Sequence, residues 1–258
     1  MPRSSHMPRS SHGGRHELGQ NFLHHQPTIR HLVSLVDPAL GPILEIGAGS
    51  GAITRMLATL GPPVTALELD EHRARALRHA LPSVTVLHAD AMRHPLHAAT
   101  LVSNVPFHLT TPLLRRVLTS RGWSRCVLLT QWEVARKRAS VGGGTLLSAQ
   151  SAPWYEFELH GRVPSRHFAP APSVDGGILS ISRRAKPLVP VAQRASYEAF
   201  AREVFVGGRS LAHAVGSGAR RDTGAAARAL REVGIARDAR ARDIRPEQWS
   251  ALWSALRR

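Results

Sequence analysis

Short apolar segments alternate with amphipathic helical segments between Pro42 and Ala139, and this alternation constrains the fold more than any other feature of the chain. The apolar segments are continuously apolar, which is typical of strands covered on both faces. Such strands, each followed by a helix, predict a parallel sheet between two layers of helices, the doubly wound α/β architecture. The expected strands are 42–51, 63–70, 83–90, 100–104 and 124–130, and the expected helices are 52–61, 71–81, 111–122 and 132–139.

The pattern changes after the glycine-rich loop at 140–145. Residues 154–163 and 174–184 alternate apolar and polar side chains and predict a pair of antiparallel strands, joined by a proline-rich segment. Beyond Arg184 the sequence predicts only helices, at 192–206, 223–234 and 245–258. We therefore expect a disordered N-terminal arm at 1–14, an α/β domain at 15–184 and a small basic helical domain at 185–258.

The charge of the chain is strongly positive. It has 34 Lys and Arg residues against 18 Asp and Glu, a net charge of +16, and nearly all the basic residues are arginine. The planar guanidinium group matches phosphate and stacks on bases. The excess therefore indicates a polyanionic partner, with nucleic acid favoured over an anionic membrane surface. A bias toward Arg codons would explain Arg in place of Lys, but not the excess over acidic residues.

Other features bear on compartment and metal binding. The single cysteine, Cys126, rules out an internal disulfide, is expected to be a core residue and agrees with a cytoplasmic protein. No apolar run approaches the ~20 residues of a membrane span, and we see no secretory signal. The closest histidine pairs, His24-His25 and His94-x-x-His97, lack the partners of a metal site. We expect no metal and no membrane association.

Polar groups follow three of the expected strands where each strand ends. The first leads into the glycine-rich segment 47–51, whose glycines permit positive φ and close approach of a ligand to the backbone. Glu68 ends the second, where it can accept both hydroxyls of a ribose, and Asp90 ends the third, where it can accept from an exocyclic amine. Because these ends meet at one edge of a parallel sheet, they predict a nucleotide-type ligand there. The alternative is a tight helix start with two incidental surface acids.

The fourth strand ends in Asn104-Val105-Pro106-Phe107. Asparagine and proline both end strands, so a simple turn is one interpretation. Together with four other segments, however, this motif resembles the S-adenosylmethionine-dependent rRNA adenine N6-methyltransferases in order and spacing. The other segments are ELGQNFL at 17–23, EIGAGSG at 45–51, ELD at 68–70 and HADA at 88–91.

The resemblance continues through 168–181 into the helical tail, and residues 130–145 and 153–184 are most similar to the Erm family. Erm enzymes methylate an adenine of 23S rRNA and confer resistance to macrolide, lincosamide and streptogramin B antibiotics. The similarity is greatest to members from macrolide-producing actinomycetes. It implies a Rossmann-like class I methyltransferase domain at 15–184, S-adenosyl-L-methionine without a metal as cofactor, and an RNA-binding helical tail. It also implies a monomer acting on naked or partly assembled 23S rRNA.

Residue roles follow from the same resemblance. Glu68 would hold the ribose hydroxyls, Leu69 would pack on the cofactor's adenine ring, and Asp90 would accept from its amine. The full set implied to bind the cofactor is Gln20, Asn21, Leu23, Gly47, Gly49, Glu68, Leu69, Asp90, Ala91 and Asn104, and the set implied to be catalytic is Asn104, Pro106 and Phe107.

The catalytic motif suits a reaction at an adenine amine. The N6 lone pair is delocalised into the ring, and acceptors placed on the two N6 hydrogens turn it toward an incoming methyl group. The side-chain oxygen of Asn104 is one acceptor, and the backbone carbonyl of Pro106 or Val105 is the other. Phe107 would stack on a flipped-out adenine.

Basic residues in loops and clusters are the candidates for contacts with RNA phosphates. Each one alone is more often a solvated charge, but together they predict an RNA-binding face. They are Arg15, Arg136, Lys137, Arg138, Arg162, Arg166, Arg183, Arg184 and Arg209, with Arg220 and Arg221 in the tail. Two alternatives stay open, a small-subunit rRNA adenine dimethyltransferase and a non-catalytic nucleic-acid-binding relative. The number of methyl groups transferred is also open.

Overall fold

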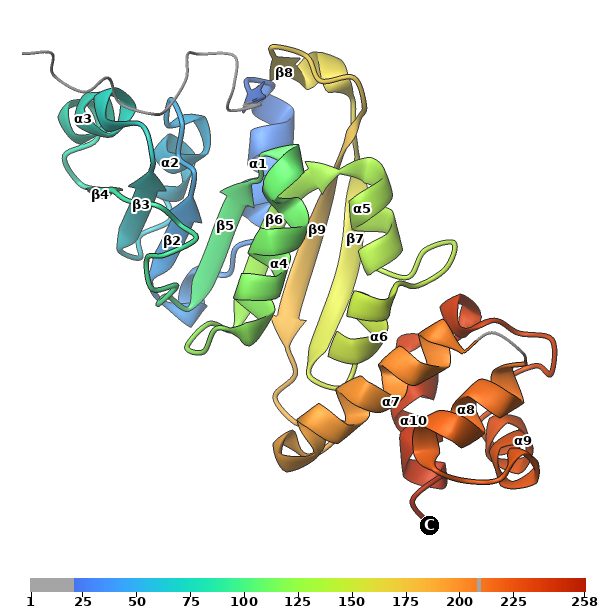
Figure 1. Ribbon diagram of the computed structural model, residues 1–258. Helices are drawn as coiled ribbons and strands as arrows, with labels where there is room; N and C mark the ends of the chain where they lie inside the picture. Colours follow the sequence, from blue (N-terminus) through green and yellow to red (C-terminus); the bar gives the residue numbers. More distant parts are fainter. Residues whose placement is uncertain (1–20, 208–209) are drawn as a thin grey trace, which may run out of the picture.

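The computed structural model describes residues 21–207 and 210–258. The predictions for the N-terminal arm and for Arg15, Gln20 and Arg209 therefore lie outside the described residues. Within them, a central sheet with helices on both sides is followed by a bundle of helices at the C-terminal end (Figure 1). The expected α/β class with a helical tail is confirmed.

The central sheet has seven strands in the order β4-β3-β2-β5-β6-β9-β7. The five strands from β4 to β6 are parallel, and β9 runs antiparallel to both β6 and β7. This is the mainly parallel sheet with a terminal antiparallel pair that the sequence predicted. The strands are β2 Ile43–Ile46, β3 Val64–Glu68, β4 Thr85–His88, β5 Thr100–Asn104, β6 Arg125–Gln131, β7 Tyr155–Val163 and β9 Gly176–Arg183.

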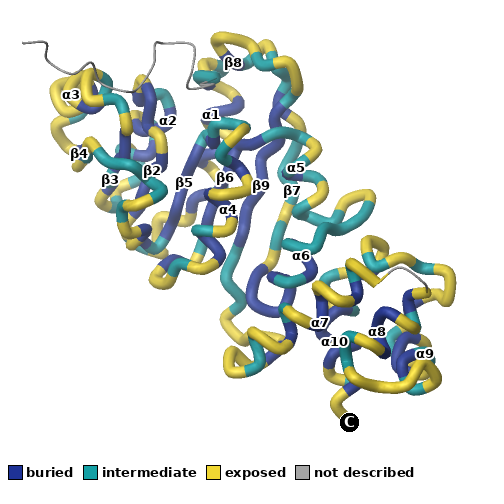
Figure 2. Tube along the Cα trace, viewed as in Figure 1, coloured by how far each residue is buried: buried dark blue, intermediate teal, exposed yellow. Residues whose placement is uncertain are grey.

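Burial follows the hydrophobic pattern of each strand. Strands β2, β5, β6 and β9 are buried along most of their length (Figure 2), whereas the edge strand β7 is buried at its ends, Tyr155 and Val163, and half-buried or exposed between them. Cys126, on β6, is fully buried, which confirms it as a core residue. The continuously apolar strands β2, β5 and β6 lie inside the sheet. Strand β9, whose sequence predicted alternation, is also buried, because it lies between β6 and β7.

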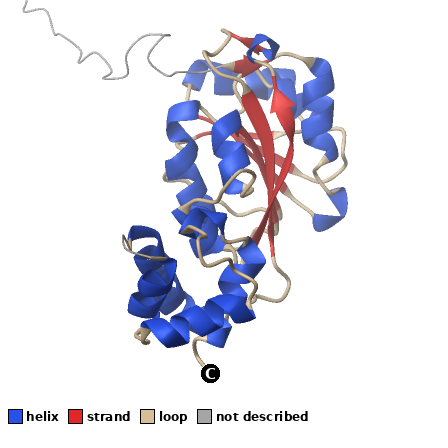
Figure 3. Cartoon of the chain, turned by 90° about the vertical axis from the view of Figure 1, so that its right-hand side faces the viewer, coloured by secondary structure: helices blue, strands red, loops and turns tan. Residues whose placement is uncertain are grey.

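Two layers of helices cover the sheet (Figure 3). Buried side chains of α1, α2 and α3 join one core cluster, and those of α4, α5 and α6 join the other. The helices of this part are α1 Gln26–Ser34, α2 Ala52–Leu57, α3 Glu71–Ala80, α4 Thr110–Thr119, α5 Trp132–Arg138 and α6 Leu146–Ser151. Helix α6 was not among the predicted elements.

A second, two-stranded sheet lies beside the carboxyl end of the parallel strands. Strand β1 (Phe22–Leu23) pairs antiparallel with β8 (Phe168–Ala169), which belongs to the segment expected only to join β7 and β9. The sequence did not predict this sheet, because two residues are too few for a hydrophobic period. The pairing fixes the N-terminal segment next to the strand ends of the main sheet.

The helical tail comprises α7 Arg194–Val206, α8 Leu211–Ala219, α9 Thr223–Glu232 and α10 Pro246–Ala255. Helix α8 was missed because it contains Gly216 and Gly218, and glycine disfavours helices. Packing explains the glycines. A Cβ on Gly218 would lie 3.2 Å from the Phe200 ring of α7, and one on Gly216 would lie 2.9 Å from the Arg221 carbonyl oxygen. Close helix contact therefore overrides propensity here.

One hydrophobic core continues from the sheet into the tail. Trp154, at the start of β7, meets Tyr197 of α7 edge to face at 5.5 Å, and the Tyr197 hydroxyl donates to the Ala149 carbonyl at 2.8 Å. This junction lies next to Tyr155, which is opposite Arg183 of β9 in the sheet. The preceding residue of β9, Ser182, is opposite Arg125 at the start of β6. The tail is therefore attached near the amino ends of the parallel strands (Figure 1). The proposed division at 184/185 stays a prediction.

Candidate active site

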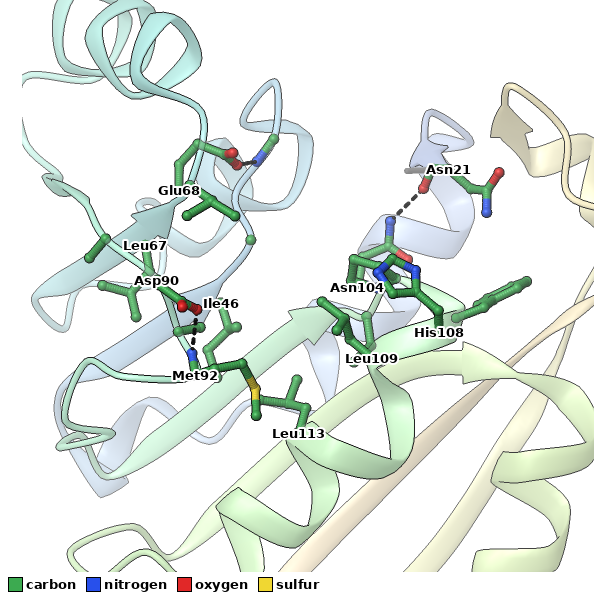
Figure 4. Close-up of a pocket in the computed structure, with 18 of the residues that line it drawn as sticks. Asn21, Ile46, Leu67, Glu68, Asp90, Met92, Asn104, His108, Leu109 and Leu113 are labelled. Carbon is green, nitrogen blue, oxygen red and sulfur yellow. Dashed lines mark hydrogen bonds between the residues drawn. The ribbon is translucent and has the colours of Figure 1, made fainter. Parts of the chain in front are cut away.

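A cavity opens at the carboxyl edge of the sheet, where β2, β3, β4 and β5 end (Figure 4). Ten of the predicted site residues line it, which brings together segments up to 86 positions apart in sequence, Asn21 and Phe107 being the extremes. They are Asn21, Gly47, Gly49, Glu68, Leu69, Asp90, Ala91, Asn104, Pro106 and Phe107. The strand-end residues therefore converge as the sequence pattern predicted.

The glycines after β2 form one wall of the cavity. Gly47 and Gly49 have φ of 75° and 58°, in the left-handed region that favours glycine. A Cβ on Gly49 would lie 3.0 Å from a ring carbon of Phe22, whereas a Cβ on Gly47 would meet nothing within 4 Å. At Gly47 the backbone conformation demands glycine, and at Gly49 both the conformation and the Phe22 ring do.

Glu68 ties the end of β3 to the glycine loop. The side chain is buried, and its Oε2 accepts from the Gly49 N–H at 2.6 Å while Oε1 accepts from the Asp70 N–H at 2.9 Å. These charge-assisted bonds hold the carboxylate at the cavity wall. Each carboxylate oxygen can accept more than one bond, so both still have capacity for the hydroxyls of a ligand.

Asn104, at the end of β5, faces the N-terminal segment. Its Nδ2 donates to the backbone carbonyl of Asn21 at 2.8 Å (Figure 4). With the amide nitrogen directed to Asn21, the amide oxygen is left to accept a bond from a ligand. The contact joins residues 83 positions apart and couples the N-terminal segment to the motif at 104–107.

Asp90 lies across the cavity, after the end of β4. Its Oδ1 accepts from the Met92 N–H at 2.8 Å, which fixes the turn, and Arg93 approaches Oδ2 at 3.7 Å. Leu69 is 47% exposed and lines the cavity, so its apolar surface is free to pack on a ring. On this side of the cavity, Asp90 therefore offers a hydrogen-bond acceptor and Leu69 offers an apolar surface.

The remainder of the motif turns directly into helix. Pro106 is followed by the 3-10 turn Phe107–Leu109, in which the Leu109 N–H donates to the Pro106 carbonyl at 2.8 Å. Phe107 and His108 both line the cavity, and His108 is the more exposed of the two. The turn therefore places an aromatic ring and an imidazole at the mouth of the site.

One predicted residue lies outside the main cavity, and several lining residues were missed. Leu23 is 3% exposed and packs in the core, although it lines a smaller adjoining cavity. The missed residues are mostly apolar and carry no chemical signal in the sequence. They are Phe22, Ile46, Leu67, Ala89, Met92, His108, Leu109 and Leu113, whereas Val105, which also lines the cavity, was already a candidate through its carbonyl.

A pair of histidines holds the N-terminal segment in place. His25 stacks on His167 with ring centroids 3.7 Å apart, and the Thr28 hydroxyl lies 2.8 Å from His25 Nδ1 and 3.0 Å from His167 Nδ1. Burial, with the charges of His25 and Arg166, lowers the pKa of His167. Neutral rings suit this stack, because two imidazolium ions would repel each other.

Comparison with known proteins agrees with this geometry. A family model described as ribosomal RNA adenine dimethylase matches residues 11–257, almost the whole chain. The chain belongs to this family. Membership agrees with the fold, because the matched region contains both the parallel sheet and the helical tail.

Individual members of the family are similar over much of the chain. The mycinamicin-resistance protein MyrB of Micromonospora griseorubida is 52% identical over 205 residues, 78% of this chain and 66% of that protein's length. An rRNA adenine N-6-methyltransferase of Corynebacterium diphtheriae is 46% identical over 74% of this chain and 78% of that protein. The solved structure of the 23S rRNA methyltransferase ErmE superposes with a TM-score of 0.84 at 31% identity, covering 92% of this chain and 100% of that one.

The family implies S-adenosylmethionine as methyl donor, and the cavity fits such a group. Its glycine cradle and the Glu68 carboxylate suit a ribose. Glu45, which lines the smaller adjoining cavity, has a buried carboxyl oxygen that lacks a partner within the described residues. No cluster of three metal-ligating side chains occurs in the described part of the chain. Nor does any helix there reach the length and apolar character needed to cross a membrane.

The basic residues predicted to bind RNA separate into two groups. Arg162 on β7 lies opposite Gly177 of β9 in the sheet, and the adjacent Gly176 lies opposite Gln131 at the carboxyl end of β6. Arg162 therefore lies at the same edge of the sheet as the cavity. Arg162 donates to Asp175 at 2.7 Å but is 61% exposed. Lys137 of α5 and Arg166 of the turn before β8 are exposed, whereas Arg136 and Arg138 of α5 are half-buried. Arg138 lines a separate cavity together with Arg184 and with Pro246 of the tail.

The second group is engaged inside the protein. Arg183 donates to the carbonyls of Trp123 and Ser120, both at 3.0 Å, and its guanidinium lies 4.9 Å from the Trp123 ring centroid. Arg184 donates to the Ala152 carbonyl and pairs with Glu156, and its side chain is 14% exposed. Their RNA-binding role stays a prediction that these contacts do not support. In the tail, Arg221 donates to the Leu256 carbonyl and Arg220 is exposed.

Proposed function

We propose that this protein transfers methyl groups from S-adenosyl-L-methionine to N6 of a specific adenine in 23S rRNA, and so confers macrolide, lincosamide and streptogramin B resistance. The observation that carries the proposal is that Asn104-Val105-Pro106-Phe107 lines the same cavity as Gly47, Glu68 and Asp90. An acceptor for an adenine amine therefore lies beside a site built for a nucleoside. The names of MyrB and ErmE support the choice of target and outcome.

The cofactor's adenosine would lie along the strand ends. Glu68 would accept from the ribose hydroxyls, Leu69 would pack on the purine, and Asp90 with Ala91 would bind the purine's amine edge. Asn21 would cover the methionine side, because its carbonyl is fixed by Asn104. When bound, the cofactor supplies a methyl group already activated by the sulfonium charge, so the protein needs chiefly to position the acceptor.

The target adenine would enter between Asn104 and Phe107. Asn104 Oδ1 would accept from one N6 hydrogen, and a backbone carbonyl would accept from the other, turning the lone pair toward the methyl. The Pro106 carbonyl already accepts from Leu109, so the Val105 carbonyl is the better second acceptor. The bound cofactor would supply the methyl group to N6 of the base, and the proton that N6 loses would pass to solvent. Asn104 supplies an oriented acceptor throughout.

Phe107 would hold the extruded base by stacking. Base–aromatic stacking is worth roughly 1–3 kcal/mol, comparable to the few kcal/mol that unstacking costs. The exposed basic residues on the cavity side, among them Lys137, Arg162 and Arg166, would contact phosphates of the flanking RNA. The protein would act as a monomer in the cytoplasm on naked or partly assembled RNA, where the target adenine can be extruded.

The test is transfer of tritiated methyl from S-adenosylmethionine to purified 23S and 16S rRNA, followed by nucleoside analysis. We expect label in 23S rRNA alone, as N6-methyladenosine or N6,N6-dimethyladenosine, and the product fixes the methyl count. Label only in 16S rRNA would assign the protein to small-subunit modification. Cofactor binding without label in either RNA would overturn the proposed reaction and favour a non-catalytic RNA-binding role.

A further inference from the structure

Trp132 differs from the other four tryptophans of the chain in being half-buried, whereas the others are between 2% and 6% exposed. The indole N–H groups of Trp123, Trp154 and Trp253 donate to protein acceptors at 2.9, 3.1 and 3.0 Å. The indole N–H of Trp132 donates to no residue in the described part of the chain. A large aromatic ring that is partly open to solvent, with its polar group unused, is typical of a binding surface.

Trp132 lies beside the proposed place of the target base. Strand β6 runs parallel to β5 with Leu129 opposite Asn104, and the Val105 N–H donates to the Leu129 carbonyl at 2.9 Å. Trp132 begins α5 shortly after Leu129, at the same edge of the sheet as the motif at 104–107. With about 3.3 Å per residue along a strand and about 4.8 Å between strands, its Cα lies no more than about 15 Å from that of Asn104. Trp132 does not line the cavity itself, so it adjoins the place of the target base without occupying it.

Packing fixes the position of the indole ring. The backbone N–H of Trp132 donates to the Asp175 carbonyl at 2.9 Å, which anchors the start of α5. Gly177 of β9 makes room for the side chain, since a Cβ there would lie 3.2 Å from the ring carbon Cε3 of Trp132. Arg162, opposite Gly177 in the sheet, places its guanidinium 5.7 Å from the ring centroid. The ring is therefore held in place before a ligand binds, which lowers the entropic cost of stacking a second ring on it.

The charges around Trp132 favour RNA as the ligand. Glu133 follows it in the chain and Asp175 accepts from its backbone, and each of these acids is paired with an arginine, at 2.9 and 2.7 Å. Lys137 and Arg166 are exposed and form no ion pair within the described residues. An aromatic ring with surplus positive charge around it suits a single strand of nucleic acid, because the bases can stack while the phosphates meet cations.

We propose that Trp132 is a second stacking site for RNA, which holds an unpaired base next to the target adenine. Extruding the target adenine unstacks its neighbours, and an aromatic face offsets part of that cost. The exposed guanidinium of Arg162 contacts the same nucleotide. The inference rests on the proposed function and extends it, because Phe107 holds the base that is methylated and Trp132 holds its neighbour.

Methyl transfer to 23S rRNA by variants of the full chain tests the proposal. Trp132→Phe keeps an aromatic face, and Trp132→Leu keeps apolar packing on Gly177 without one. We expect Trp132→Phe to stay near the wild type and Trp132→Leu to lose about 5- to 150-fold in kcat/KM for RNA. Cofactor affinity and Tm should be the same in both variants. Val141→Ala, at an exposed apolar residue of the next loop, is the control that should behave as the wild type.

Equal kcat/KM for the Phe and Leu variants, beside an active wild type, would overturn the inference. No transfer by the wild type would instead overturn the proposed function, so the two failures are distinguishable. If Trp132→Leu does not fold, intrinsic fluorescence decides, because the other tryptophans are buried. Quenching by 23S rRNA that disappears in Trp132→Phe supports the inference. Quenching that is absent from the wild type, or that persists in Trp132→Phe, refutes it.

Discussion

The two ends of the parallel strands differ in how their polar side chains are used. At the carboxyl end, Glu68, Asp90 and Asn104 converge on one cavity, with each side chain fixed by a backbone contact. At the amino end, Arg183 and Arg184 are also fixed by backbone carbonyls, but they join the sheet to its neighbours, and Arg184 lines only a smaller cavity between the sheet and the helical tail. Similar hydrogen bonding therefore lines the proposed cofactor site at one end and joins structural elements at the other.

The difference teaches that position relative to the sheet identifies a site better than residue type does. A parallel sheet gathers every strand end at one edge, so a polar residue after a strand has a predictable neighbourhood. An arginine in a loop has no predictable neighbours, because its long side chain can reach a phosphate, a carbonyl or an aromatic ring. The predictions below test this contrast, beginning with the largest expected effect.

Glu68→Gln should have the largest effect on cofactor affinity. The substitution removes the charge that accepts from Gly49 and Asp70 and can direct an NH₂ group toward one of these N–H donors. Charge-assisted hydrogen bonds are worth about 1.5–3 kcal/mol each, so we expect cofactor affinity to fall about a hundredfold. Calorimetry measures the affinity, and Glu71→Gln, at an exposed acid on α3, is the matched control. Equal affinities for both variants would remove Glu68 from the binding site.

Phe107→Ala should have the next largest effect. Loss of stacking at roughly 1–3 kcal/mol predicts a fall in kcat/KM for RNA of about 5- to 150-fold, with cofactor affinity unchanged. Phe107→Tyr retains the ring and should stay near the wild type. Methyl transfer over a range of RNA concentrations measures both, and equal rates for the Ala and Tyr variants would exclude a stacking role.

Arg166→Ala and Arg183→Ala should behave oppositely, which sharpens the comparison directly. Arg166 is exposed, so its loss should leave the Tm unchanged and reduce the salt dependence of RNA binding by about one charge. Arg183 holds two carbonyls and the Trp123 ring, so its loss should destabilise the fold by about 1–2 kcal/mol. Thermal unfolding and RNA titrations at several salt concentrations measure these effects. A stable Arg183→Ala variant with reduced salt dependence would reverse the assignment.

The histidine pair predicts a small pH effect. The pKa of His167 is lowered in the folded protein, so the unfolded chain binds more protons as pH falls. The contribution of His167 to stability is therefore complete above its ordinary pKa of 6.5 and declines below it. The Tm should fall from pH 7.5 to pH 5.5 by less in His167→Gln than in the wild type. An equal fall in both would show that other groups set the pH dependence.

Much of this architecture could be predicted, because the hydrophobic pattern of most segments matches the place that each segment takes in the folded protein. The segment 100–104 was predicted as a strand and is β5, since a short apolar run before Asn-Val-Pro has few other conformations. The β1–β8 pair could not be predicted, because its stability comes from tertiary contacts. Helix α8 was missed for a related reason, as Gly218 is needed for packing against Phe200.

The candidate site was likewise only partly predictable. Glu68 and Asn104 stand out chemically and at strand ends, so the sequence was enough to select them. Met92 and Leu113 line the cavity through shape alone, and apolar residues of this kind occur throughout the chain. The internal contacts of Arg183 depend on Trp123, 60 positions away, and no sequence pattern shows that contact.

The central claim, that the cavity at the strand ends delivers an oriented adenine amine to a methyl donor, is tested most directly with Asn104→Ala. Cofactor affinity and methyl transfer to 23S rRNA are measured on the same preparations of the variant and the wild type. We predict that transfer is lost while cofactor affinity changes by no more than a few-fold, because the missing group acts on the target base. Transfer at the wild-type rate would contradict the account.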